Sequence, residues 1–119
     1  MIVAGIGCRR GCPAEDIVAL VRLAEGRAAC RVDALAAPDF KQDETGVHEA
    51  ARRLGVALMF VAAPALAAVQ PLCPTRSEAA ARHAGAASVA EGSALAASGG
   101  RLLLARVANG RATCALAEA

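Results

Sequence analysis

The residues of this sequence most able to bind a charged ligand are Arg9 and Arg10, in the stretch GIGCRRG at residues 5–11. They follow a short apolar run typical of a buried strand, and a helix start is predicted directly after them. Guanidinium groups and the free N–H groups of a helix start both bind carboxylate or phosphate. The alternative is a plain strand-to-helix turn with two arginines on its surface.

The glycines of this stretch exclude two known phosphate-binding loops. Their spacing is G-x-G-x-x-x-G, so the third glycine comes one residue too late for the dinucleotide fingerprint. The stretch also lacks the Gly-Lys-Ser/Thr sequence of a P-loop. An anion-binding turn of another kind remains as its functional interpretation.

The cysteines do not form a metal or redox motif. Cys8 and Cys12 have the spacing C-x-x-x-C rather than the redox spacing C-x-x-C, and no second Cys/His pair has zinc spacing. The five cysteines are scattered, and Met1 leads directly into an apolar run with no basic segment before it. We therefore expect small buried thiols in a cytoplasmic protein, with no metal site and no cofactor.

Carboxylates follow two further apolar runs and could act as general acids or bases. Lys41 and Glu44 follow the second predicted strand, close to Asp39. They could hold a ligand and move a proton, or form an exposed ion pair worth a few tenths of a kcal/mol. Glu91 ends a short apolar run and precedes Gly92-Ser93, a pattern poorly explained as simple surface. A nucleophilic triad is not supported, because Ser93 has no His or Asp close in sequence.

Composition bounds the class of protein. The chain has 119 residues, 56% apolar and 20% charged, so one domain with a substantial hydrophobic core is expected. Aromatic residues make up 2% and the formal net charge is +2, which argues against nucleic-acid binding. No charged side chain occurs between Arg53 and Arg76, but prolines interrupt this segment. A buried strand followed by a short helix is therefore expected there, rather than a membrane span.

Apolar runs, helix caps and glycine stops alternate along the chain as strands and helices. Strands are predicted at 2–7, 32–36, 56–61, 88–91, 101–107 and 112–119, and helices at 13–26, 43–55, 64–69, 77–85 and 92–100. The run 56–61 is expected to be a central strand, and Asn109-Gly110 predicts a closing hairpin. The expected fold is α/β: one three-layer α/β/α domain over 1–119, with a mixed, mostly parallel sheet of about five or six strands.

In such a sheet, ligands bind beyond the carboxyl ends of the parallel strands. GIGCRRG, the cluster from Asp39 to Glu44, and Glu91 with its neighbours each follow a predicted strand. We therefore expect these three stretches to share one edge of the sheet, which would suit an anionic ligand.

Taken in order, these landmarks resemble one family. GIGCRRG, KQDETGVHEAARRLGV, PTRSEAAARHAG, SVAEGSALAASGGRLLL and the ending NGRATCALA are similar to the C-terminal domain of the cobalamin-biosynthesis protein CbiG, which also occurs as the free-standing protein CobE. The resemblance covers essentially the whole chain. It implies a role in corrin-ring formation, with a tetrapyrrole (a precorrin or corrin intermediate) as ligand and other enzymes of the pathway as candidate partners.

The resemblance also directs attention to particular residues. The candidate ligand-binding residues are Gly7, Cys8, Arg9, Arg10, Gly11, Lys41, Ser77, Ser93 and Thr113, and the candidate catalytic residues are Glu44 and Glu91. Ser93 is included for its place after Glu91 rather than as a family position. The sequence departs from the family where a lysine is usual after the RLLL-type strand, because Arg106 stands there.

Three functions remain open at this point. The first is an accessory or carrier protein that binds a precorrin or corrin intermediate through its carboxylates. The second is a hydrolase that opens the ring-A-derived lactone of (cobalt-)precorrin-5A with release of acetaldehyde, the activity of CbiG-type proteins. The third sets the resemblance aside and is a generic α/β module for a phosphorylated metabolite.

Overall fold

One mixed sheet with the strand order β3-β2-β1-β5-β4 forms the centre of the computed structural model, which describes residues 1–75 and 88–119. The strands are β1 (Ile2–Cys8), β2 (Ala34–Pro38), β3 (Ala57–Val61), β4 (Arg101–Ala108) and β5 (Ala112–Glu118). β1, β2 and β3 pair in parallel, whereas β5 is antiparallel to both β1 and β4. The mixed sheet and its closing β4–β5 hairpin are confirmed.

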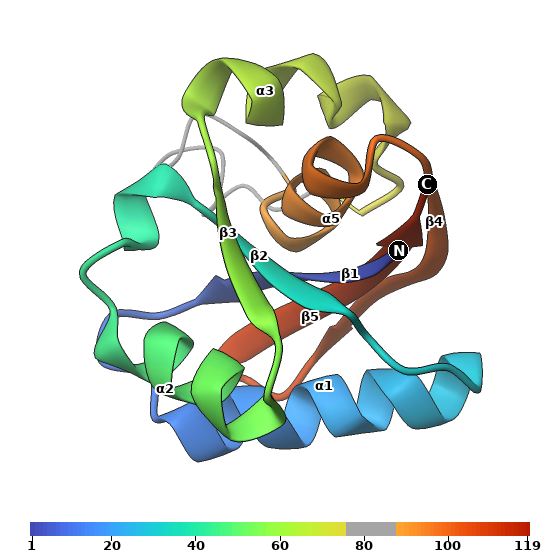
Figure 1. Cartoon of the computed structure of the whole chain (residues 1–119). Coiled ribbons are helices and arrows are strands. Elements are labelled where there is room, and N and C mark those ends of the chain that lie inside the picture. The colour runs from blue at the N-terminus through green and yellow to red at the C-terminus, as the bar shows by residue number, and fades with distance from the viewer. Residues whose placement is uncertain (76–87) are drawn as a thin grey trace.

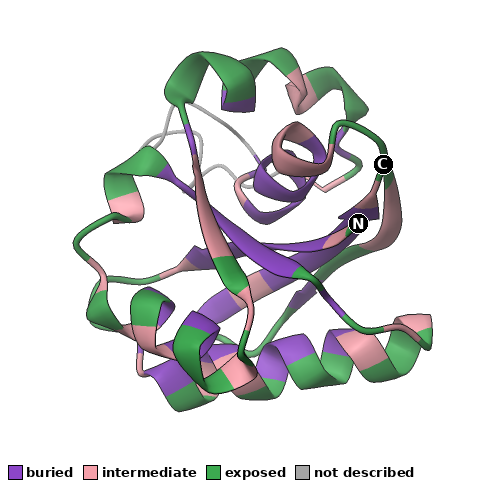
Figure 2. Ribbon diagram, viewed as in Figure 1, coloured by how far each residue is buried: buried purple, intermediate pink, exposed green. Residues whose placement is uncertain are grey.

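Helices cover both faces of this sheet, as the α/β prediction requires (Figure 1). They are α1 (Ala14–Ala28), α2 (Thr45–Leu54), α3 (Ala63–Ala68) and α5 (Ala90–Ser98), with short 3-10 turns η1 (Asp39–Lys41) and η2 (Gln70–Leu72). α1 and α2 lie together on one face, and α5 with α3 on the other. Buried residues run along β1, β2 and β5 and along the inner sides of the helices (Figure 2).

β1 is buried on both faces, and a glycine in it lets α5 approach closely. A Cβ on Gly5 would overlap the carbonyl oxygen of Ala90 and stand 2.5 Å from the backbone nitrogen of Ala94. Both are backbone atoms of α5, so no side-chain movement could make room. The first turn of α5 is thereby held against the middle of β1.

Three local predictions were wrong. The run 88–91 is not a strand, because α5 already begins at Ala90 and includes Glu91 in its first turn. The run 56–61 forms β3, which lies at an edge of the sheet rather than at its centre. Gly26 does not end the first helix: the turn comes at Ala29, in the left-handed region at φ 52°, where the backbone N–H groups of Ala29 and Cys30 bond to the carbonyl oxygen of Glu25.

The uncharged segment after Arg53 forms β3, α3 and η2, so a strand followed by a short helix is confirmed there. Within residues 1–75 and 88–119, no helix is long and apolar enough to cross a membrane. The predicted helix at 77–85, and Ser77 with it, lies outside the described residues.

Candidate functional site

The carboxyl ends of β1 and β2 meet at one edge of the sheet, and the loops that follow them are bonded to each other. We call this edge the rim; it consists of the loop 9–13 after β1, the segment 39–44 after β2, and the hairpin turn 109–111. The backbone N–H of Gly11 donates to Glu44 Oε1 at 2.7 Å. Two of the three stretches predicted to share this edge are therefore in direct contact.

The rim exposes cations. Arg9 and Arg10 are exposed, and Lys41 is half-buried. None of the three forms an ion pair within the described part of the chain. The Lys41 ammonium is close enough to Cys8 to lower the pKa of its thiol, although burial outweighs it. Lys41 of the segment after β2 therefore lies near the end of β1, which directly precedes Arg9 and Arg10.

Phe40 is a rim residue that sequence reasoning missed. It is 55% exposed, and the Lys41 ammonium lies 5.8 Å from the centre of its ring. The chain contains two phenylalanines and no tyrosine or tryptophan. A lone aromatic side chain between Asp39 and Lys41 was the available signal, because an exposed aromatic residue beside a binding motif is often a contact surface.

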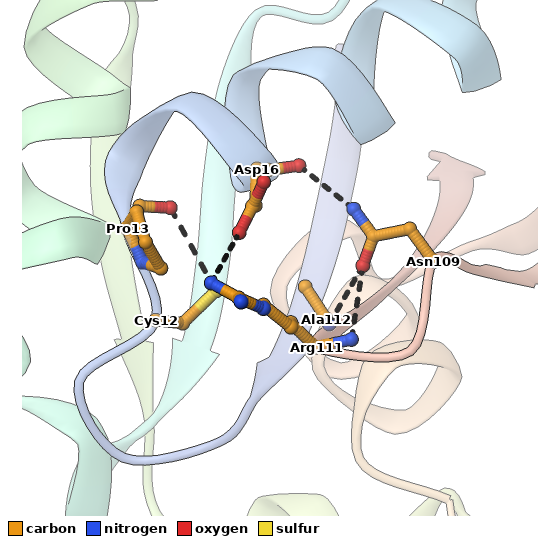
Figure 3. A network of polar contacts seen from close by, with 6 residues as sticks. All are labelled: Cys12, Pro13, Asp16, Asn109, Arg111 and Ala112. Carbon is orange, nitrogen blue, oxygen red and sulfur yellow. Dashed lines mark hydrogen bonds and ion pairs between the residues drawn. The ribbon is translucent and has the colours of Figure 1, made fainter.

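The hairpin turn closes the rim on its third side (Figure 3). Asn109 Oδ1 accepts from the backbone N–H groups of Arg111 and Ala112, and Asn109 Nδ2 donates to the carbonyl oxygen of Asp16 at 3.1 Å. Arg111 also pairs with the Asp16 carboxylate at 3.5 Å. In addition, the backbone N–H of Arg9 donates to the Arg111 carbonyl oxygen at 3.0 Å. The hairpin therefore fixes both the loop after β1 and the start of α1.

Thr113 and Gly7 lie at the ends of β5 and β1 that adjoin the rim. They are directly paired across β5 and β1, and the Thr113 hydroxyl donates to the Gly7 carbonyl oxygen at 3.4 Å. A Cβ on Gly7 would stand 2.6 Å from the Thr113 hydroxyl oxygen. Gly7 thus leaves the space that Thr113 occupies, and the side chain of Thr113 remains only half-buried.

Glu91 is fully buried, and its carboxylate accepts four hydrogen bonds from the described residues. The donors are the backbone N–H and the hydroxyl of Thr75, the hydroxyl of Ser88, each at 2.9 Å, and the backbone N–H of Arg106 at 3.0 Å. Burial raises the pKa of this carboxyl, but the hydrogen bonds outweigh burial and leave the pKa below its ordinary value. Glu91 is therefore ionised and already satisfied, and the structure does not bring it out to the surface of the rim.

Ser93 is also fully buried, and its hydroxyl has no hydrogen-bond partner among the described residues.

The Gln70 side chain fixes the chain just before α5. It accepts from the backbone N–H of Ser88 and donates to the Ser88 carbonyl oxygen, both at 2.9 Å. Two partners of Glu91 could not be read from sequence, because Thr75 and Arg106 lie 16 and 15 residues away along the chain.

Four of the five thiols are not poised as nucleophiles. Burial raises the pKa of Cys8 to about 11 and that of Cys114 to about 12. It also raises the pKa values of Cys12 and Cys30 above the ordinary value. In residues 1–75 and 88–119, no three His, Cys, Asp or Glu side chains are grouped so that they could hold a metal ion.

Comparisons with known proteins agree with this architecture. Residues 2–117 match the family described as cobalamin synthesis G C-terminus. The protein CobE of a Sinorhizobium species is 32% identical over 121 residues, which cover 98% of this chain and 79% of that protein.

Two solved structures share the fold. A crystal structure of CobE, described as a protein from the cobalamin (vitamin B12) biosynthetic pathway, has a TM-score of 0.91 and 40% identity, and the match covers 98% of this chain and 88% of that one. The cobalamin biosynthesis protein chiG from Agrobacterium tumefaciens has a TM-score of 0.79 and 42% identity, over 99% and 98% of the two chains. The chain therefore belongs to the CobE/CbiG C-terminal domain family of cobalamin biosynthesis proteins.

Proposed function

We propose that this chain binds a precorrin or corrin intermediate of cobalamin biosynthesis, and that the rim holds the carboxylates of that intermediate. The observation that carries the proposal is that the candidate cations are unpaired while the candidate carboxylates are already bonded. Arg9, Arg10 and Lys41 are not paired within the described residues, whereas the carboxylates of Glu44 and Glu91 are already bonded to other parts of the chain. The segment 39–44 also exposes Asp39 and Asp43. At the candidate positions, however, the cations are open and the carboxylates are occupied, which favours binding over proton transfer.

The chemistry of the ligand class fits this surface. Corrin precursors carry acetate and propionate groups around a flat, largely apolar ring. Arginine forks bind carboxylates through paired, charge-assisted hydrogen bonds, and lysine adds a point charge. The exposed ring of Phe40 lies beside Lys41 and offers an apolar surface for the macrocycle.

Titration with corrin intermediates, followed by their absorbance bands, tests the proposal. We expect a saturable spectral shift, and we expect Arg9→Ala and Arg10→Ala each to weaken binding by about tenfold or more. Arg31→Ala is the matched control, because Arg31 is also exposed but lies before the amino end of β2. Absence of a saturable shift, or equal losses in all three variants, would contradict the proposal.

Opening of the lactone of (cobalt-)precorrin-5A is the second candidate function, and one observation favours it. Glu44 is only half-buried, and its carboxylate lies at the rim next to Gly11. It could activate water, with Arg9 or Lys41 stabilising the developing oxyanion. Acetaldehyde release is the measurement. If Glu44→Gln retains full turnover, Glu44 is not the base, and if the wild-type chain releases no acetaldehyde, the binding proposal stands alone.

The third function left open by the sequence was a generic α/β module for a phosphorylated metabolite. That hypothesis set the family resemblance aside, and the chain's membership of the family removes its basis. A cytoplasmic location and contact with other enzymes of the pathway belong to the binding proposal. Cys8, Cys12, Cys30 and Cys114 form no disulfide within the described residues, which is consistent with a reducing compartment.

A further inference from the structure

The two edge strands of the sheet differ in how they are protected. β4 has two register shifts against β5 and carries Arg101 and Arg106. Such irregularities and charges are the means by which natural sheets prevent an edge from pairing with another chain. β3 has neither, since it pairs with β2 in unbroken register from Ala57 to Val61 and contains no charged residue and no proline.

The open edge is apolar on both faces of the sheet. Leu58 and Phe60 pack against the core between the sheet and α1, while Met59 packs against the core on the α5 side. All three are only half-buried, and no strand of the described residues pairs with the outer side of β3. Both hydrophobic cores therefore reach the surface along this one strand.

The strand β3 itself carries no charge that would repel a second copy. No charged side chain occurs between Arg53 and Arg76. Arg52 and Arg53, which precede the strand, are both paired with Glu49 on α2, so one of their two positive charges is offset. An uncharged, apolar edge offers nothing specific to a basic or acidic partner, but it is complementary to itself.

We propose that β3 pairs with β3 of a second copy of this chain, in antiparallel fashion about a two-fold axis through Met59. This register sets Met59 opposite its own copy, Leu58 opposite Phe60, and Ala57 opposite Val61. Directly opposed residues point to the same face of the sheet, so apolar side chains continue across the β3–β3 pairing on both faces of one common sheet. A two-fold axis makes this pairing closed, which limits the assembly to a dimer.

The proposed dimer leaves the rim free. Because paired β3 strands run in opposite directions, the carboxyl ends of the two sheets point away from each other. Each copy could then bind its ligand independently, and the dimer does not depend on the function proposed above.

Sedimentation velocity of the full chain over a range of concentrations tests the proposal. We expect a species of twice the 11.9 kDa chain mass. Met59→Lys should weaken dimerisation by about tenfold or more, because two lysines would lie directly opposite each other. Leu103→Lys is the matched control, since Leu103 is an equally half-buried leucine on the protected edge strand β4. It should leave the dimer intact.

A second measurement on the wild-type chain needs no variant. Backbone amides of β3 should exchange with deuterium more slowly as protein concentration rises, while amides of β4 stay unchanged. A chain that remains monomeric at high concentration overturns the proposal. So does a dimer that Met59→Lys leaves intact, or one whose β3 amides exchange at the same rate at all concentrations.

Discussion

Gly46, in the first turn of α2, lies directly against the carbonyl oxygen of Cys12 in the loop that follows β1. A Cβ on residue 46 would overlap that oxygen, and the next nearest atoms are the Cys12 carbonyl carbon at 3.2 Å and the Ala14 nitrogen at 3.4 Å. All of these are backbone atoms, so none can rotate away. Together with the bond from Gly11 to Glu44, this contact joins the two cationic segments of the rim into one unit.

We predict that Gly46→Ala lowers the free energy of unfolding by about 1–3 kcal/mol, because the added methyl group must displace backbone. The same change should weaken binding of corrin intermediates, since it moves the loop that carries Arg9 and Arg10. Thermal unfolding followed by circular dichroism measures the first effect. Gly26→Ala is the control: Gly26 lies inside α1 with no atom near its Cβ position, so this variant should be more stable by about 0.5–1 kcal/mol. A Gly46→Ala variant as stable as the wild type would show that the contact is not tight.

Replacing Glu91 with glutamine should destabilise the fold. Glutamine offers one acceptor oxygen to four donors, and its NH2 group would face N–H or O–H groups. We expect a loss of about 1–3 kcal/mol near neutral pH in urea denaturation. Glu15→Gln, on the exposed face of the first turn of α1, should have only a small effect.

The pH dependence of this loss has a definite sign. The pKa of Glu91 is lowered in the folded chain, so its stabilisation is fully present above the ordinary value of 4.5 and is lost as pH falls through the folded pKa. The difference between wild type and Glu91→Gln should therefore shrink in acid. A difference that grows in acid would mean that Glu91 is protonated in the folded state.

Asn109 is predicted to stabilise the rim through the hairpin. Asn109→Ala removes two acceptor contacts and one donor contact, and should cost about 1–2 kcal/mol in denaturant unfolding. Asn109→Asp keeps the acceptor oxygen but not the donor to Asp16, so it should be less damaging than alanine. If both variants lose equal stability, the bond to Asp16 carries the effect.

The thiols of Cys8 and Cys114 should react slowly with iodoacetamide in the folded protein. Burial raises their pKa values from 9.0 to about 11 and about 12, so the thiolate fraction near neutral pH falls by about a hundredfold or more. Mass spectrometry of labelled peptides should show modification of both cysteines tens of times more slowly than in guanidinium, where the chain is unfolded. Rapid labelling of Cys8 in the native state would show that the carboxyl end of β1 opens.

The order of strands and helices could be predicted from the sequence because each depends on local patterns. Continuous apolar runs between glycines predicted β1, and Asn109-Gly110 predicted the closing hairpin, which the structure confirms. The family could likewise be read from ordered motifs along the chain. In each case the information lies within a few neighbouring residues.

Only tertiary contacts decided the rest. Residues 88–91 look like a strand locally, yet α5 begins at Ala90 because Gly5 admits it and because Glu91 bonds to Thr75 and Arg106, 16 and 15 residues away. The apolar run 56–61 predicts burial, but its place at the sheet edge follows from strand order. Glu44 meets Gly11 across 33 residues. The sequence thus determined the elements and the cations of the rim, while the fold decided which carboxylates are occupied, because their partners come together only when the sheet forms.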